Sequence, residues 1–280
     1  MYFTPINSRN AVLEAIFTIG LDRPFSPPEM ASVRDAHRDL ALDLPKLEQT
    51  QVSFVGQMLS PGLLADMPAV GPVSMSSFQR DGTLDSRLMV GENLISLNFL
   101  AYSSWAEHWD RGNSWLERIV KTLASSGNSA GLPPLHVQTI SHHMIDVFKW
   151  TGEAAAVGVV DLFSPSVDRL PSAVAIARGQ AWSATHAYSA PVTQPAVGQI
   201  QDWLGCDLND EPRFGWRVRV DNMLEFRPTS PPTLEESFKE NSGNSLVASA
   251  ASVLHAQNRR VMTYLLIPEM ASRIGLRAST

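Results

Sequence analysis

The chain has 280 residues, 44% of them hydrophobic and 18% charged, with a formal net charge of −6 at pH 7. This length and apolar content support a sizeable core, as one large domain or two lobes. The 22 basic residues are scattered, and their densest pairing is Arg259-Arg260. Direct nucleic-acid binding is therefore disfavoured, because it needs basic residues gathered on one face.

The N-terminal stretch 1–17 lacks the basic start and the continuous apolar run of a signal peptide. No segment approaches the roughly 18 uninterrupted apolar residues of a membrane-spanning helix. The single cysteine, Cys206, excludes an internal disulfide and suits a reducing compartment. A lone thiol can be a nucleophile, but with no base visibly beside it, this one is more simply a small buried or half-exposed side chain. We therefore expect a soluble cytoplasmic protein without membrane association.

The first predicted element is a strand over 10–20, in which both alternating faces are largely apolar, as in a central strand. A Ser-Pro-Pro-Glu capping box at 26–29 then opens a predicted helix that ends or kinks near Pro45. Residues 52–57 predict a short strand. The proline-rich stretch 60–72 predicts a packed loop.

The most informative stretch is 73–123, which predicts a three-strand antiparallel meander followed by a tryptophan-bearing helix. Asp-Gly at 81–82 is a hairpin signal, because both residues tolerate positive φ, and 91–93 form a second turn. The alternating residues of the third strand that we expect to face the core are Ile95, Leu97, Phe99 and Ala101.

The helix after the meander opens with a second capping box, Ser-x-x-Glu at 104–107. Trp105 and Trp109 begin its apolar stripe, and Gly-Asn at 112–113 predicts a kink or split. Trp115 is offset from that stripe by about 160°, at about 100° per residue. It either lies exposed, as aromatics at interfaces do, or packs under a loop.

A small, polar, turn-rich stretch at 125–134 predicts a lobe boundary or a long surface loop. Beyond it, the predicted strands cover 136–150, 154–163, 173–188 and 214–226, and the predicted helices cover 194–205, 234–238 and 246–266. Because both halves place strands before a long helix, we predict an α+β fold of antiparallel β-meanders, each covered by long helices. The two similar lobes would span 1–132 and 133–280, although no residue-level repeat is visible.

Three short signatures occur along the chain. The first is a Glu-Ala pair in the apolar strand at 11–15, and the second is Tyr-x-x-Trp at 102–105. The third is a helix containing Leu254-His255, followed by an apolar run at 261–267 and a short final element at 268–276. In these signatures and in its order of elements, the chain resembles an uncharacterised, sporadically distributed bacterial protein family. It departs from the family at 8–11, which lack Pro-Pro, and at 142–143, where His-His replaces an Arg-Tyr-x-Asn run. The resemblance implies no activity, but it implies an accessory role in a defence system or a mobile element.

His142 and Asp146 are the nearest approach to a metal site. They share one face of the predicted strand but lie roughly 13 Å apart along it, whereas ligands converge within about 2.0 to 2.2 Å of an ion. Without a bend they are polar strand positions. A metal-dependent hydrolase that uses them with distant acids is one alternative; otherwise we expect no catalytic residue, metal or cofactor.

His255 and Arg259 share a helix face, and with Arg260 they can bind an anion or a partner's carboxylate. The same residues also suit a solvated helix end that complements the helix dipole. The binding residues that we predict are Tyr102, Trp105, Trp115, His255, Arg259 and Arg260.

The chain contains no Gly-x-Ser-x-Gly, Gly-x4-Gly-Lys, His-Glu-x2-His or Cys-x2-Cys motif. The sequence therefore favours a non-enzymatic cytosolic protein that binds a protein partner, or forms a homo-oligomer, through 102–115 and 255–260. The alternatives are the metal-dependent hydrolase and a small-molecule-binding sensor with a pocket between sheet and helix.

Overall fold

The computed structural model describes residues 2–7, 10–51, 70–165, 169–212, 215–239 and 245–276. The strands are β1 (Phe3–Pro5), β2 (Val12–Leu21), β3 (Lys46–Gln51), β4 (Val70–Phe78), β5 (Leu84–Gly91), β6 (Leu94–Phe99), β7 (Val137–Trp150), β8 (Trp182–Val192), β9 (Gly198–Glu211) and β10 (Gly215–Pro228). The α-helices are α1 (Pro27–Leu40), α2 (Trp105–Ser129), α3 (Ser172–Ile176), α4 (Leu234–Phe238), α5 (Leu246–Leu265) and α6 (Pro268–Arg273). Two short 3-10 helices, η1 (Ala154–Ala156) and η2 (Val159–Asp161), follow β7.

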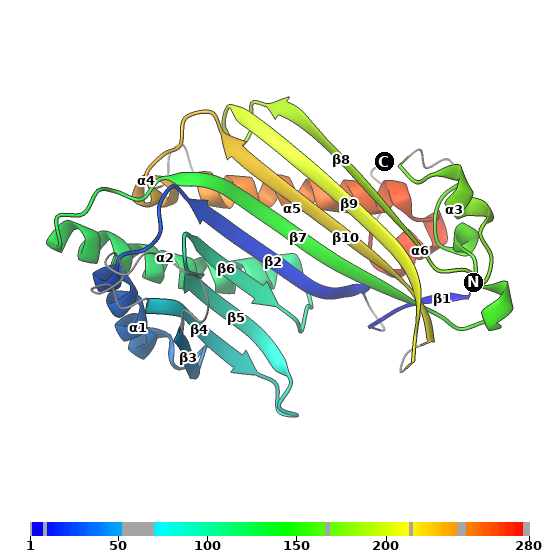
Figure 1. Ribbon diagram of the computed structural model, residues 1–280, viewed down its shortest axis with the longest axis horizontal. Helices are drawn as coiled ribbons and strands as arrows, with labels where there is room; N and C mark the ends of the chain where they lie inside the picture. Colours follow the sequence, from blue (N-terminus) through cyan, green and yellow to red (C-terminus); the bar gives the residue numbers. More distant parts are fainter. Residues whose placement is uncertain are drawn as a thin grey trace, which may run out of the picture.

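These strands form one antiparallel ten-stranded sheet in the order β3-β4-β5-β6-β2-β7-β10-β9-β8, and β1 pairs with the end of β7. Figure 1 shows α2 and α5 behind the sheet, with α1 beside α2. The predicted central strand is confirmed, because β2 lies between β6 and β7. Among the described residues, no helix is both long and apolar enough to span a bilayer.

The prediction of separate meanders, each covered by long helices in two similar lobes, is wrong. β2 pairs with β7 from Val12↔Asp146 to Leu21↔Val137, so one sheet crosses the predicted boundary. Strands hold more of the described residues than helices do, and α3, α4 and α6 have only 5, 5 and 6 residues. Separated halves would expose β2 and β7 as long edges, and their pairing satisfies those backbone groups. A domain division at 132/133 stays a prediction.

The predicted meander is confirmed as β4, β5 and β6. Its first turn has Gly82 at φ 84°, and its second has Glu92 at φ 52°. Asp81 Oδ1 accepts the Thr83 N–H at 2.9 Å and fixes the first turn. Three of the four residues expected to face the core are buried in the third strand, with exposures of 0% for Ile95, 0% for Leu97 and 2% for Phe99. The fourth, Ala101, lies beyond the end of β6 and is half-buried.

Helix α2 runs without a break through Gly112, so the predicted kink or split is wrong. A Cβ at Gly112 would lie 2.7 Å from Leu97 Cδ1 and 2.9 Å from Phe99 Cζ. Glycine is required there because it lets the helix approach β6 closely. The helix continues to Ser129, into the stretch predicted as a boundary or loop.

Several predicted elements in the second half are wrong. Residues 154–163 contain η1 and η2 rather than a strand, 173–188 contain α3 before β8, and 194–205 belong largely to β9 rather than a helix. β9 forms because it pairs with β10 over its whole length, which overrides a local helical spacing of apolar residues. The predicted strand at 52–57 lies outside the described residues, as does most of the predicted loop after it.

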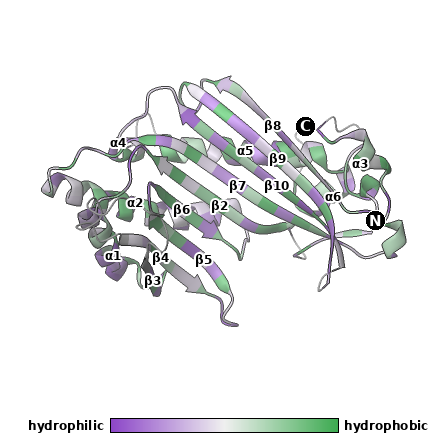
Figure 2. Cartoon of the chain, viewed as in Figure 1, coloured by the Kyte–Doolittle hydropathy of each residue, from purple (hydrophilic) through white to green (hydrophobic). Residues whose placement is uncertain are grey.

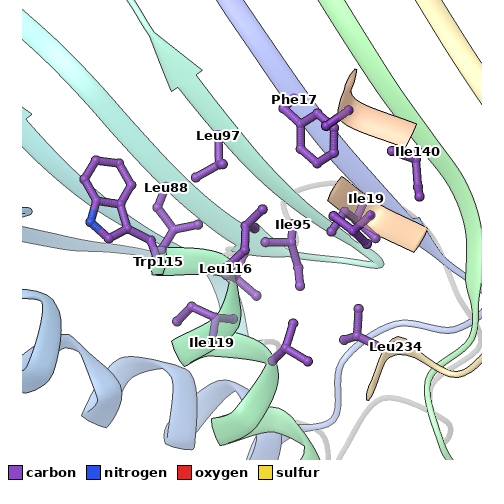
Figure 3. Close-up of a cluster of buried hydrophobic side chains, with 14 of the residues drawn as sticks. Phe17, Ile19, Leu88, Ile95, Leu97, Trp115, Leu116, Ile119, Ile140 and Leu234 are labelled. Atoms are coloured by element: carbon purple, nitrogen blue, oxygen red, sulfur yellow. The ribbon is translucent and has the colours of Figure 1, made fainter. Parts of the chain in front are cut away.

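The polar and apolar residues alternate along most strands, as Figure 2 shows. One buried cluster packs β2, β4, β5 and β6 against α1, α2 and the first half of α5; the other packs β9 and β10 against the end of α5 and α6. Figure 3 shows part of the first cluster, where α2 residues such as Leu116 and Ile119 lie near the sheet residues Leu88 and Ile95. The helices therefore bury one face of the sheet.

Candidate functional site

Four of the predicted binding residues, Tyr102, Trp105, His255 and Arg259, line one pocket. Trp105, the first residue of α2, stacks on His255 of α5, with ring centroids 4.5 Å apart and an interplanar angle of 11°. The ring of His142 on β7 lies 4.7 Å from Trp105 and nearly perpendicular, at 82°. α2, β7 and α5 thus converge on the Trp105 cluster, which consists of Trp105, His142 and His255.

The pocket beside this cluster has a volume of about 320 Å³, and we call it the Asp146 pocket. Its wall consists of residues 10–12, the junction at 102–105, part of β7, part of α5 and residues 274–276. Helical periodicity places residues 255, 258, 259 and 262 of α5 on the side that faces the pocket. Five segments that are distant in sequence therefore build one site.

A wider groove of about 900 Å³ lies between α1 and α2. Several of its polar side chains already bond to the neighbouring backbone: Arg118 donates to the Asp39 carbonyl at 2.8 Å, and Thr122 donates to the Arg118 carbonyl at 3.0 Å. The Asp146 pocket is the better candidate because the Asp146 carboxyl on its wall receives no hydrogen bond from any described residue.

Asp146 is the unusual residue of the pocket. Alternation along β7 points it, like Met144, toward the helices, and only 4% of Asp146 is exposed. The register of β2 shifts between Val12 and Glu14, opposite Asp146, and such bulges re-aim side chains beside functional sites. No described residue donates a hydrogen bond to the Asp146 carboxyl, and burial, together with the charge of Asp221, raises its pKa to about 7.

Tyr102 lies close to both charged residues of the pocket. Burial raises the pKa of its hydroxyl, the charge of Asp146 raises it further, and the charge of Arg259 lowers it. Both charges are therefore within electrostatic reach of this hydroxyl. Asn10 Nδ2 donates to the Tyr102 carbonyl at 3.1 Å, and Arg259 donates to the Gly275 carbonyl at 3.2 Å. These bonds fix the wall at both sides of the pocket.

The two histidines of the Trp105 cluster are neutral at pH 7. Burial, with the charges of nearby histidines, holds the pKa of His142 well below its usual range. Burial and the charge of Arg259 lower the pKa of His255 to about 4. Among the described residues, no hydrogen-bond partner is found for either ring nitrogen of His142 or for His255 Nδ1. The cluster is therefore an aromatic, uncharged wall rather than an acid–base pair.

The predicted metal pair of His142 and Asp146 is divided between two surroundings. His142 belongs to the Trp105 cluster, whereas Asp146 lines the pocket, and four residues of β7 separate them by roughly 13 Å. Within the described ranges, no group of three or more His, Cys, Asp and Glu side chains is placed to hold a metal ion. The metal-dependent hydrolase stays an untested hypothesis.

A buried polar chain begins at the pocket wall and crosses the sheet. Asn258 Nδ2 donates to Asn222 Oδ1, and Asn222 Nδ2 donates to Asp202 Oδ1, both at 2.9 Å. Arg169 donates to Asp202 Oδ2 at 3.2 Å and to the Tyr188 hydroxyl at 2.8 Å. The chain fixes the Asn258 side chain in the wall and directs its amide nitrogen away toward the sheet.

Two side chains that resemble nucleophiles are not activated. Ser103 Oγ lies 3.4 Å from His108 Nε2, but it donates to Glu107 at 2.7 Å. His108 Nε2 accepts the Ser103 backbone N–H at 2.9 Å, so its lone pair is already used. Cys206 is buried as expected, and burial raises its pKa to about 12, which keeps the thiol protonated.

Trp115 and Arg260 do not join the pocket. The exposed placement of Trp115 is wrong: it is 1% exposed, stacks on Phe99 at 6.2 Å and donates to Asp43, in the loop after α1, at 3.1 Å, which agrees with the alternative that it packs under a loop. Trp115 lies one turn before Ile119 and so belongs to the buried stripe of α2, which faces β6 and the loop after α1. Arg260 is exposed and donates to Gln257 at 3.0 Å.

The sequence analysis missed Asn258, Asn222 and Asp202, and it considered Asp146 as a metal ligand or a polar strand position but not as a binding residue. A signal was present for Asp146 and Asn258. Asp146 lies at an inward position of an alternating strand, and Asn258 continues the apolar stripe of its helix. A polar residue at an otherwise apolar inward position predicts a buried polar group that needs a partner.

No protein-family model matches the chain, and no curated protein is significantly similar to it. The family resemblance in the sequence signatures therefore stays a prediction. The functional argument rests on the geometry of the Asp146 pocket.

Proposed function

We propose that this protein is a non-enzymatic binding protein that holds a small ligand in the Asp146 pocket. The observation that carries the proposal is the Asp146 carboxyl, which is 4% exposed and receives no hydrogen bond from any described residue. A buried polar group without a partner destabilises the folded state. A ligand that donates a hydrogen bond to this carboxyl removes that destabilisation.

The other wall residues support a small-molecule site. About 320 Å³ lies at the small end of the range for ligand pockets. Trp105 and His255 form a flat stacked surface, and Tyr102 and Arg259 add a hydroxyl and a cation. An apolar wall with a few convergent polar groups is typical of pockets that bind small molecules.

The broader setting is part of the same proposal. A cytoplasmic location, a protein partner or homo-oligomer, and an accessory role in a bacterial defence system or mobile element are supported by the sequence patterns alone. In such a role, ligand occupancy of the Asp146 pocket would be the signal that the protein senses.

Native mass spectrometry tests the proposal. Wild-type protein and the Asp146→Leu variant are incubated with a protein-free small-molecule extract and then desalted. We expect a retained mass on the wild type that the variant loses, because leucine fills the carboxyl position without accepting a hydrogen bond. Arg260→Gln, which changes an exposed cation outside the pocket, is the matched control and should retain the same mass. Equal retention by wild type and Asp146→Leu, or none by either, would overturn the proposal.

A further inference from the structure

We propose that the ligand of the Asp146 pocket is a small linear zwitterion whose ammonium group binds the Asp146 carboxylate and whose carboxylate binds the Arg259 guanidinium. The inference rests on the proposed function, since it assigns a chemical class to the ligand of that same pocket.

The ammonium end is assigned to the buried side of the pocket. Asp146 offers two carboxyl oxygens that no described group uses as acceptors, and an ammonium group carries three donors. The amide nitrogen of Asn258 donates to Asn222, which leaves the amide oxygen of Asn258 as an acceptor on the same wall. A buried carboxylate is stabilised most by a paired cation that also donates hydrogen bonds.

The carboxylate end is assigned to Arg259, on the solvent side. A guanidinium has five N–H donors in a planar fork, and the Arg259 side chain uses one of them on the Gly275 carbonyl. Within the described ranges, no Asp or Glu side chain forms an ion pair with Arg259. Its remaining donors are free to bind a carboxylate in the bidentate manner that arginine favours.

The two charged ends are apart, which sets the length of the ligand. Asp146 and Arg259 form no ion pair with each other, yet the charge of each acts on the Tyr102 hydroxyl. Both poles are therefore close to the Tyr102 hydroxyl. The wall of the pocket also includes Met144 and Met262, whose apolar side chains suit a methylene chain. An ω-amino acid fits this arrangement better than an α-amino acid, whose charges are adjacent.

The net charge of the pocket also favours a zwitterion. The charges of one carboxylate and one guanidinium sum to zero. A purely cationic ligand would leave the Arg259 guanidinium without a counter-charge, and a purely anionic ligand would bring a second negative charge close to the Asp146 carboxylate. A like charge brought into a low-dielectric site is disfavoured. A ligand with one charge of each sign pairs both ends.

Isothermal titration calorimetry with β-alanine, γ-aminobutyrate and ε-aminocaproate tests the inference, with butylamine and butyrate as single-charge controls. We expect the longer zwitterions to bind wild-type protein and each single-charge control to bind at least about tenfold more weakly. Asp146→Asn and Arg259→Gln should each weaken zwitterion binding by at least about tenfold, whereas Arg260→Gln should leave it unchanged.

The pH dependence supplies a second readout. Affinity should rise between about pH 6 and about pH 8, because only ionised Asp146 attracts the ammonium group. The other groups that face Asp146 keep their charge in this range: Tyr102 stays protonated, His255 stays neutral and Arg259 stays charged. Asp221 stays ionised, because hydrogen bonds from His143 and Arg219 outweigh burial and lower its pKa.

The outcomes separate the inference from the proposed function. A single-charge compound that binds as well as γ-aminobutyrate, or an equal loss in Arg260→Gln, would overturn the zwitterion assignment. If no panel compound binds while native mass spectrometry shows an Asp146-dependent retained mass, the inference falls and the proposed function stands. If neither experiment detects a ligand, both fall.

Discussion

Replacing Trp115 by alanine should lower the free energy of unfolding by about 3 to 5 kcal/mol, the usual range for truncating a buried aromatic side chain. The residue is 1% exposed, stacks on Phe99 and lies 5.3 Å from the Arg111 guanidinium. Truncation removes these contacts and leaves Asp43 without its indole donor. For a chain of this size, the melting temperature should fall by roughly 10 °C, measured by thermal or urea unfolding.

Two further variants control this prediction. Leu42→Ala removes a large apolar side chain that is 100% exposed, and it should change stability by less than about 0.5 kcal/mol. Trp115→Phe keeps an aromatic ring but loses the indole donor, so its loss of stability should lie between that of Leu42→Ala and that of Trp115→Ala. A Trp115→Ala protein that melts within a degree or two of wild type would contradict the buried placement and restore the contact-surface interpretation.

Asp146→Asn is expected to stabilise the ligand-free protein, by up to about 4 kcal/mol at about pH 8. The carboxyl has a pKa of about 7 in the folded state and 3.8 in the unfolded state, a difference worth about 1.4 kcal/mol per pH unit. Between these values the folded state binds more protons than the unfolded state, so wild-type stability falls as pH rises. Asparagine does not titrate, so the difference in the free energy of unfolding between Asp146→Asn and wild type should grow from about pH 4 to about pH 7.

The comparison is made by urea unfolding of both proteins across this pH range. His142 and His255, whose pKa values are lowered, destabilise the folded state as pH falls below about 6.5, the opposite direction. Both proteins contain these histidines, so their effect cancels in the difference. Asp110→Asn, on an exposed position of α2, is the matched control and should bring no gain. An Asp146→Asn protein no more stable than wild type at about pH 8 would show that the carboxyl has a partner or solvent.

A residue whose replacement raises the stability of the folded protein is typical of a functional site, because selection retains the residue for its function rather than for stability. The same substitution is expected to stabilise the free protein and to abolish ligand binding. The two effects have one cause, the absence of a donor for the Asp146 carboxyl within the described chain.

Local patterns predicted the first half of the fold well. The turn residues at 81–82 and 91–93 specify positive φ, and the alternation in 94–101 specifies the buried face, so the meander follows from short-range chemistry. The capping box at 26–29 likewise predicted the start of α1, where Ser26 and Glu29 bond reciprocally. Such features need no knowledge of distant residues.

Long-range pairing decided what the sequence could not predict. β9 contains apolar residues at helical spacing, and it is a strand because β8 and β10 flank it. Gly112 resembles a helix breaker, yet it is the contact that seats α2 on β6. The union of both halves through β2 and β7 also depends on partners more than 100 residues apart. None of these is visible in a local window.

The candidate site was predicted in part. Tyr102, Trp105, His255 and Arg259 were selected as two separate contact surfaces, and the fold places all four around one pocket. Their convergence could not be predicted, because it depends on how α2 and α5 dock on the sheet. Asp146 was recognised as a polar strand residue, but its lack of a partner is a property of the assembled site.

Carbon-detected NMR of protein labelled at the aspartate side-chain carboxyls tests the central claim most directly, because it reports the ionisation of Asp146 itself. We expect one carboxyl resonance to titrate near pH 7, to vanish in Asp146→Asn, and to titrate at lower pH when γ-aminobutyrate is present. If every aspartate carboxyl of the free protein titrates below about pH 5, Asp146 is already solvated or paired, and the pocket has no unmet need for a ligand.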